Sequence, residues 1–303
     1  MDFGKLSDIS LVDFTLPADA SQTKAVLQKY VKKASGPAIY VGCPIWTNKD
    51  WLGKVYPSMA KEKDFLYHYA RQFNTIELNT THYRIPDTET IERWKAAATP
   101  GFTFSPKFPQ IISHEKQLDE AEDLTLDFCE AIRGLGEYLG TSFLQLAPNF
   151  SPKYFPLLES YVRFFPKDIP LAIEFRHQDW FKPSLVSTKA FELLEQYNIS
   201  KVITDVAGRR DVLHQRLTTP TAMIRFVGNG LHPTDYTRVN DWVERCLEWM
   251  NGGLQTLYFF VHEPDNKFSP ELVAYFIQNM NEKGNFHLTP PRITPQPVQG
   301  TLF

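Results

Sequence analysis

The stretch Ile173-Glu174-Phe175-Arg176 decides the fold class, because apolar and charged side chains alternate through it. Side chains two residues apart lie on the same face of a β-strand. Ile173 and Phe175 are therefore expected to face covering helices, while Glu174 and Arg176 face the other way. Charged groups are costly to bury unless they are paired. The second face of this strand thus predicts a polar interior where several such strands meet.

Seven other short runs resemble this one, and a helix-type stretch follows nearly every run. Eight strands that alternate with helices predict a closed (β/α)8 TIM barrel with a parallel sheet. An open doubly wound sheet is the main alternative, but no glycine-rich phosphate motif follows the first run. The connection after the sixth run has room for only a short helix. The expected strands are Ala38–Cys43, Asn74–Asn79, Phe102–Lys107, Thr141–Leu146, Leu171–Arg176, Ser200–Asp205, Thr221–Val227 and Thr256–His262.

The chain is expected to divide into three parts. Residues 1–37 form an N-terminal extension with one helix, from about residue 18 to residue 33, before Ser35-Gly36-Pro37. Residues 38–283 form the barrel as a single domain. Residues 284–303 contain four prolines, at positions 290, 291, 295 and 297, and predict an extended tail.

Composition narrows the class of protein. The 303 residues carry 32 basic and 35 acidic side chains, so no strong overall field attracts nucleic acid or a membrane surface. The three cysteines are scattered without metal-type spacing, which favours a reducing compartment. The N-terminus has no signal-peptide pattern, and no apolar run reaches membrane-spanning length. We therefore expect a soluble, cytoplasmic protein.

The C-terminal ends of barrel strands form the mouth, where barrel enzymes carry their active sites. Alternation along the strands and the polar residues that close them predict one shared polar cavity there. So many ionisable groups at the same height in the barrel favour an active site over structural ion pairs, because their burial is costly. For Asn79 or Gln145 taken alone, a structural role and a functional role are equally supported. The side chains expected to face this cavity are Glu77, Asn79, Lys107, Gln145, Glu174, Arg176, Asp205, Arg225 and His262.

These residue types predict acid/base chemistry on an anion. Glu77 and Glu174 are the candidate general acid and base, because neighbouring carboxylates in a partly dry cavity can have pKa values pushed apart. Lys107 is a third catalytic candidate, as a base of lowered pKa, a Schiff-base amine or a counter-ion. Arg176 and Arg225 can grip a phosphate or carboxylate. The leading hypothesis is a metal-independent hydrolase or lyase that needs no cofactor.

Further substrate contacts are expected on the loops of the rim. Tyr83 and His114 follow the second and third strands, and His177 and Trp180 follow the fifth. Aromatic rings beside cationic donors can stack on a sugar or base. For Trp180, a hydrophobic cover over the rim is an equally good interpretation.

A divalent-metal enzyme is an alternative function. Carboxylate and imidazole groups from four strands can act as metal ligands. Nearby cations oppose this interpretation, because they repel a metal ion. The candidate ligands would be Glu77, Glu174, Asp205 and His262.

The last five residues, Gln299-Gly300-Thr301-Leu302-Phe303, suggest a protein partner. They resemble the Q-x-x-L-F peptides by which bacterial replication and repair proteins bind the sliding clamp. Such a peptide places Leu302 and Phe303 in an apolar pocket while Gln299 fixes its orientation. The other interpretation is that Leu302 and Phe303 pack on the barrel. A clamp-tethered nucleic-acid maintenance factor is thus a second hypothesis, against which the net charge of −3 counts.

Several motifs occur in fixed order along the predicted barrel. They include Gly42–Trp46, Phe73–Asn79, Lys107–Pro109, Phe143–Pro148, Ile173–His177, Thr204-Asp205 and Arg225–Gly228. Together these motifs resemble the DUF72 (YecE-like) family over about residues 38–270. The resemblance implies a TIM barrel and supplies no reaction. The sequence departs from the family pattern at Cys43-Pro44 and at Val261-His262-Glu263, which leaves any role for Cys43 and His262 open.

Overall fold

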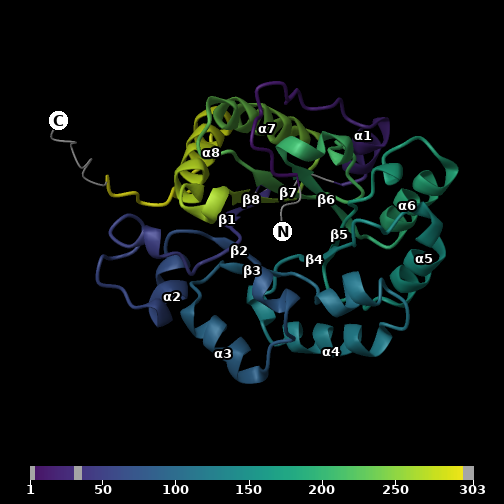
Figure 1. Ribbon diagram of the computed structural model, residues 1–303, viewed down its shortest axis with the longest axis horizontal. Helices are drawn as coiled ribbons and strands as arrows, with labels where there is room; N and C mark the ends of the chain where they lie inside the picture. The colour runs from purple at the N-terminus through teal and green to yellow at the C-terminus, as the bar shows by residue number, and fades with distance from the viewer. Residues whose placement is uncertain (1–3, 31–35, 296–303) are drawn as a thin grey trace.

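A computed structural model describes residues 4–30 and 36–295, and these residues contain a (β/α)8 barrel (Figure 1). The eight parallel strands that the alternation of sequence patterns predicted are present, and they lie in the order β3-β2-β1-β8-β7-β6-β5-β4. The observed strands are β1 Ala38–Cys43, β2 Thr75–Leu78, β3 Thr103–Pro106, β4 Ser142–Gln145, β5 Leu171–Glu174, β6 Ser200–Asp205, β7 Thr221–Val227 and β8 Thr256–His262.

The barrel closes between β3 and β4 through a short seam. Gly140 N donates to Phe104 O at 2.8 Å, and Phe108 N donates to Phe143 O at 2.9 Å. Lys107 and Phe143 form an isolated parallel β-bridge, of which the hydrogen bond from Phe108 N is part. The backbone of Lys107 is therefore fixed at the closing seam, just beyond the end of β3.

Helices cover the outside of the sheet on every side except after β6, where a 3-10 segment over Ala207–Val212 replaces the helix (Figure 1). This agrees with the short connection that the sequence predicted. The N-terminal helix is shorter than predicted, and residues 31–35 lie outside the described part. The helices are α1 Ser21–Gln28, α2 Phe65–Tyr69, α3 Thr88–Ala97, α4 Glu122–Arg133, α5 Phe155–Phe164, α6 Leu185–Gln196, α7 Pro233–Gly252 and α8 Ser269–Gly284. Within the described residues, none of these helices has the length and apolar character needed to cross a membrane.

Two apolar layers support the barrel. The outer layer packs sheet against helix, as where the rings of Phe259 and Phe276 stack with centroids 3.9 Å apart. The inner layer fills the barrel itself, and full burial of such side chains contributes roughly 1.5–3 kcal/mol each. Its members are Phe143, Ala172, Val202, Met223, Tyr258 and Phe260, with Tyr40 packed against them. This inner layer closes the barrel beneath the polar side chains of the mouth.

The N-terminal extension lies against the β6 side of the barrel. Gly208 N donates to Gly4 O at 2.8 Å, and a Cβ atom at Gly208 would approach that oxygen to 2.8 Å. Arg210 donates through Nε to Asp13 O at 3.1 Å and through Nη2 to Phe14 O at 3.0 Å. The extension therefore packs on the loop that follows β6.

The described part of the C-terminal tail, residues 285–295, contains no helix or strand and lies along the seam between α8 and α2. Leu288 N donates to Asn281 Oδ1 at 2.9 Å, and Arg292 N donates to Gln72 Oε1 at 2.9 Å. Thr294 N then donates to Lys54 O at 2.9 Å, on the loop after β1. Gln299, Leu302 and Phe303, the predicted partner-binding residues, lie outside the described residues.

Candidate active site

Arg225, from β7, joins the two glutamates of the mouth. It donates to Glu77, from β2, through Nε to Oε2 at 2.8 Å and through Nη2 to Oε1 at 2.9 Å. Its Nη1 donates to Oε2 of Glu174, from β5, at 3.0 Å. Strands that are not neighbours in the sheet are thus cross-linked through one guanidinium group. Arg225 was expected to grip a substrate anion, and here it grips protein carboxylates instead.

Glu174 has no unused hydrogen-bond acceptor position in its own cluster. Its Oε1 accepts from Arg176 Nε at 3.0 Å and from Thr204 Oγ1 at 2.9 Å. Its Oε2 accepts from Gln145 Nε2 at 2.7 Å in addition to Arg225. Each oxygen therefore accepts two hydrogen bonds. Thr204 is a member of this cluster that the sequence analysis missed.

Glu77 is bound in the same way. Its Oε1 accepts from Asn79 Nδ2 at 2.9 Å as well as from Arg225. Its Oε2 accepts from Arg225 and from His262 Nε2, which lies 2.9 Å away at the end of β8. Glu77 is fully buried, and no carboxylate oxygen in the cluster is left with fewer than two donors.

Both glutamates are stabilised in the ionised form. Burial opposes ionisation of Glu174, but the charges of Arg176 and Arg225 outweigh it and lower its pKa to about 2. Burial likewise opposes ionisation of Glu77, and there Arg225 and His262 hold the pKa well below its usual value. The prediction that these two pKa values are pushed apart to give an acid and a base is therefore wrong. Both groups carry their charge at neutral pH and hold the arginine.

Lys107 differs from the other charged groups of the mouth. Within residues 4–30 and 36–295 its amine makes no hydrogen bond and no ion pair, and 7% of the residue remains accessible. Burial and the nearby charge of Arg225 lower its pKa to about 8, although Glu77 and Glu174 act in the opposite direction. A lysine with this pKa exchanges protons near neutral pH.

Two histidines lie beside Lys107. His82 Nδ1 lies 2.8 Å from Phe108 O and must carry the proton of that bond. Burial is the main cause that lowers the pKa of both His82 and His114 to about 4, and the charge of Lys107 is the second cause. Both imidazoles are therefore neutral. Their ring centroids are 5.3 Å apart. His114 was a predicted substrate contact, whereas His82 was not predicted, because its only signal in the sequence is its position directly after the second strand.

The tautomer of His114 follows from its neighbour. Ser113 Oγ donates to Pro109 O at 3.1 Å and therefore accepts the bond from His114 Nδ1 at 2.8 Å. Both Nε2 atoms then carry lone pairs, and both are buried without a hydrogen-bond partner in the described part of the chain. The surroundings of Lys107 thus contain neutral hydrogen-bond acceptors in place of a carboxylate counter-ion.

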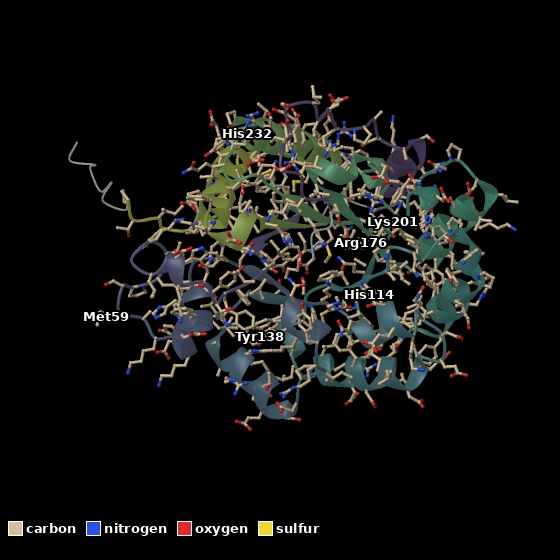
Figure 2. The ribbon with its side chains drawn as sticks, viewed as in Figure 1. Met59, His114, Tyr138, Arg176, Lys201 and His232 are labelled. Atoms are coloured by element: carbon tan, nitrogen blue, oxygen red, sulfur yellow. The ribbon has the colours of Figure 1, made fainter. Side chains whose placement is uncertain are left out.

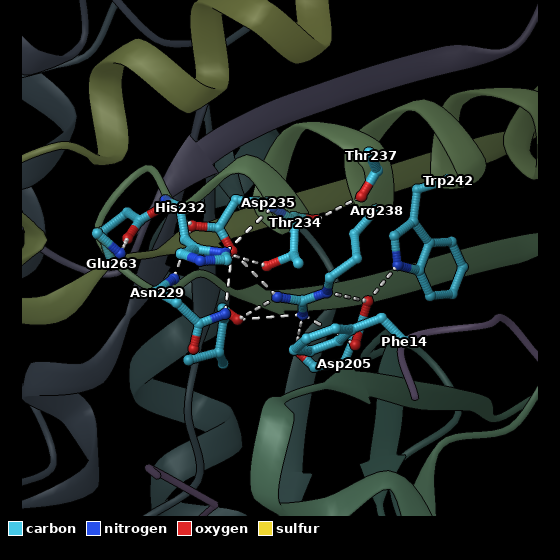
Figure 3. Close-up of polar contacts among 12 residues, drawn as sticks. Phe14, Asp205, Asn229, His232, Thr234, Asp235, Thr237, Arg238, Trp242 and Glu263 are labelled. Carbon is cyan, nitrogen blue, oxygen red and sulfur yellow. Dashed lines mark hydrogen bonds and ion pairs between the residues drawn. The ribbon is translucent and has the colours of Figure 1, made fainter. Parts of the chain in front are cut away.

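The structure places Asp205 outside the barrel, so the prediction that it faces the mouth is wrong (Figure 3). Its carboxylate accepts hydrogen bonds from Arg238 Nε at 3.3 Å and from Trp242 Nε1 at 2.7 Å, both on α7, and forms an ion pair with Arg238 Nη2 at 2.9 Å. Arg210 also pairs with it. Thr204, one residue earlier, takes the inward position, because inward and outward residues alternate along β6. Asp205 therefore anchors α7 to the sheet.

Three predicted contacts on the rim occupy different environments. Trp180 is completely buried and donates through Nε1 to Phe150 O at 2.6 Å, so it lies in the core and not at a substrate surface. Tyr83 is 77% exposed. His177 is partly exposed and accepts from Asp179 N through Nδ1 at 3.2 Å. In Figure 2, Arg176 and His114 lie toward the middle of the molecule, whereas Met59 projects at its edge.

The charges of the mouth favour an anion. Lys107, Arg176 and Arg225 supply three positive charges and Glu77 and Glu174 two negative ones, which leaves an excess of one positive charge.

The four proposed metal ligands do not converge, because Asp205 lies on the outer face. No group of three or more His, Cys, Asp or Glu side chains with metal-binding geometry occurs in the described ranges.

Comparisons with known proteins give a family and a fold. The family described as "Protein of unknown function DUF72" matches residues 40–297. The "UPF0759 protein YecE" of Escherichia coli is 30% identical over 286 residues, which cover 88% of this chain and 100% of that protein. The "UPF0759 protein YunF" of Bacillus subtilis is 26% identical over 152 residues, which cover 48% of this chain and 53% of that protein.

Two crystal structures have the same fold. A DUF72 family protein from Enterococcus faecalis superposes with a TM-score of 0.64 at 22% identity, covering 86% of this chain and 99% of the other. A DUF72 family protein from Thermotoga maritima gives 0.61 at 23% identity, covering 82% of this chain and 100% of the other. Neither description names a reaction.

Proposed function

The chain belongs to the DUF72 family, and we propose that it is a metal-independent enzyme that acts on a small phosphate- or carboxylate-bearing substrate at the barrel mouth. The reaction class is acid/base chemistry of the hydrolase or lyase type. The observation that carries this proposal is the contrast between Lys107, to which no counter-ion is bonded in the described part of the chain, and two glutamates whose oxygens are all occupied.

Lys107 is the group best suited to contact and protonate a substrate. Its pKa of about 8 lets it act either as an ammonium that binds an anion or as an amine that accepts a proton. Arg176 adds a second positive charge beside it. A positively charged, largely buried site of this kind attracts an anion more strongly than an exposed site, because water screens it less.

Glu77 and Glu174 have a supporting role in this proposal. They fix Arg225 and Arg176 in position and balance the two positive charges that these arginines bring into the barrel, which leaves the charge of Lys107 in excess. A metal ion at the same carboxylates would have to displace Arg225 and approach Lys107, which is electrostatically unfavourable. Acid/base chemistry without a metal is therefore the function that this arrangement supports best.

Titration calorimetry with inorganic sulfate tests the proposal. We expect saturable binding by the full-length protein and a loss of at least tenfold in affinity for Lys107→Met. Lys95→Met, on the exposed face of α3, is the matched control and should bind like the wild type. Equal affinities in all three proteins would place the anion site elsewhere and overturn the proposal.

A partner-binding function for the C-terminal peptide is a second proposal. The described tail is held along α8 and α2 as far as Thr294, shortly before Gln299 in the sequence. Gln299, Leu302 and Phe303 would then engage a sliding clamp as an extended peptide. A pull-down on purified clamp should retain the full-length protein and lose a form that ends at Val298. Equal retention of both forms would remove this proposal.

A further inference from the structure

We propose that Lys107 forms an imine with its substrate, which therefore carries a carbonyl carbon close to its anionic group. The substrate class is a small oxo-acid or oxo-phosphate. This inference rests on the proposed function, because it uses the same positive charges to hold the anion. It goes further by assigning a covalent step and a functional group to the substrate.

The position of the amine supports a nucleophilic role. Lys107 extends inward from the closing seam, and its amine has no hydrogen bond or ion pair among the described residues. Two other buried lysines show the contrast. Lys54 is paired with Glu271 and donates to Lys267 O at 2.7 Å, so its nitrogen is occupied. Lys201 is only 1% accessible and lies 3.4 Å from the ring centroid of Phe191, out of reach of a substrate.

The surroundings of Lys107 favour a reactive amine. A lysine is nucleophilic only when it is unprotonated, and burial beside other cations increases the unprotonated fraction. Arg225 and Arg176 are such cations, and burial acts in the same direction. The glutamates nearby cannot take up the amine as a hydrogen-bond donor without displacing one of their existing partners.

The same cations define where the substrate lies. Arg225 donates to the two glutamates, so it acts on the substrate through its charge and not through a direct grip. An anionic group drawn into the mouth by the charges of Arg176 and Arg225 would place the adjoining part of the substrate next to the amine. A carbonyl carbon there is the electrophile with which an amine reacts reversibly. His82 and His114, neutral and with unprotonated Nε2 atoms, add hydrogen-bond acceptors on the same side. These acceptors can take a hydrogen bond from the amine or from the hydroxyl group of a carbinolamine, which a carbonyl compound forms on reaction with Lys107.

The covalent step balances without any further reactant. The Nζ lone pair attacks the carbonyl carbon, and the carbonyl oxygen takes up a proton to give a carbinolamine. The proton on that oxygen comes from the attacking nitrogen, and a second proton, from solvent, converts the hydroxyl group into water, which leaves as the nitrogen lone pair forms the protonated imine. Free amine, carbonyl compound and one proton are thus converted into an iminium ion and one water molecule.

Reductive trapping tests the inference directly. Full-length protein is incubated separately with pyruvate, as an oxo-acid, and with dihydroxyacetone phosphate, as an oxo-phosphate, and each sample is reduced with borohydride. Intact-mass spectrometry should show one adduct per chain with at least one probe, and peptide mapping should locate it on Lys107. Which probe reacts identifies the class of anion.

Two variants make the test specific. Lys107→Arg keeps the positive charge but cannot form the imine, so it should lose the adduct at least tenfold while it still binds sulfate. Lys54→Arg is the matched control at a buried but paired lysine, and it should be labelled like the wild type. Sulfate binding without any adduct on Lys107 would overturn the imine and leave the anion site in place. The imine proposal would also be overturned if the adducts were spread over surface lysines and the amount of labelling were the same in Lys107→Arg as in the wild type.

Discussion

Arg225 reaches across the barrel to Glu77 and binds it through both Nε and Nη2, at 2.8 and 2.9 Å. β7 and β2 are separated in the sheet by β8 and β1, so this pair connects strands that do not contact each other through their backbones. A bidentate pair in a buried setting is rigid as well as strongly attractive. The mouth is therefore organised around a fixed arginine rather than around two catalytic carboxylates.

The first prediction concerns Glu77→Gln. The substitution leaves Arg225 buried with less compensating charge, and the loss of one partner of a buried pair costs about 3–5 kcal/mol. Denaturant unfolding should show a decrease of this size in the free energy of unfolding. Glu92→Gln is the control, because its exposed pair with Lys95 contributes less than about 1 kcal/mol. A decrease no larger than that of the control would show that Glu77 is not a structural partner of Arg225.

The second prediction concerns acid stability. The pKa of Glu174 is lowered to about 2 in the folded protein, whereas the unfolded chain has the ordinary value near 4.5. A lowered carboxyl pKa stabilises the fold above the unfolded pKa, and the stabilisation is lost as the pH falls toward the folded pKa. The free energy of unfolding should therefore fall between about pH 4.5 and pH 2, and less steeply in Glu174→Gln. Parallel pH curves for the two proteins would contradict this account.

The third prediction concerns the pH dependence of anion binding. Lys107 has a pKa of about 8, and its charged form is the one that attracts an anion. Sulfate keeps the same charge from pH 6.5 to pH 9.5, so its affinity should fall over this range as the ammonium loses its proton. Calorimetry at both pH values should show this fall in the wild type and not in Lys107→Met. A fall of the same size in the variant would assign the titration to another group.

The fourth prediction separates Asp205 from the mouth. Asp205→Asn removes the negative charge that compensates the buried guanidinium group of Arg238, on α7. The substitution should therefore lower the free energy of unfolding by about 3–5 kcal/mol. The fraction that remains folded should bind sulfate with wild-type affinity, because the side chain lies outside the barrel. Asp168→Asn, in an exposed pair with Arg133, controls for loss of a surface charge. A change in sulfate affinity for Asp205→Asn would show that it acts on the mouth.

The sequence predicted the barrel because the strand signal repeats locally. Alternation over a few residues also predicted the side of the sheet for Glu77, Glu174 and Arg225. The same alternation gave the wrong side of the sheet for Asp205. Val202 and Ile203 are neighbours and both are apolar, so they do not indicate which residues of β6 face the interior. The partner that decides this position, Arg238, lies on α7, and no local pattern indicates that pairing.

The chemical state of the mouth was equally hidden from the sequence. Two glutamates among cations are compatible with a catalytic pair and with structural counter-ions. The difference depends on how many donors each oxygen receives, and these donors come from strands far apart in the chain, such as Asn79, Gln145 and His262. That Lys107 has no ion-pair partner among residues 4–30 and 36–295 follows from the same distribution of bonds.

Lys107, and neither glutamate, is the group that we propose meets the anionic substrate at the barrel mouth. An anomalous difference map from crystals of the full-length protein soaked in selenate tests this contact. We expect a selenium peak in the mouth with an oxygen of the anion within hydrogen-bonding distance of Lys107 Nζ. A peak only at surface sites, with an unoccupied mouth at selenate concentrations that saturate binding in solution, would contradict it.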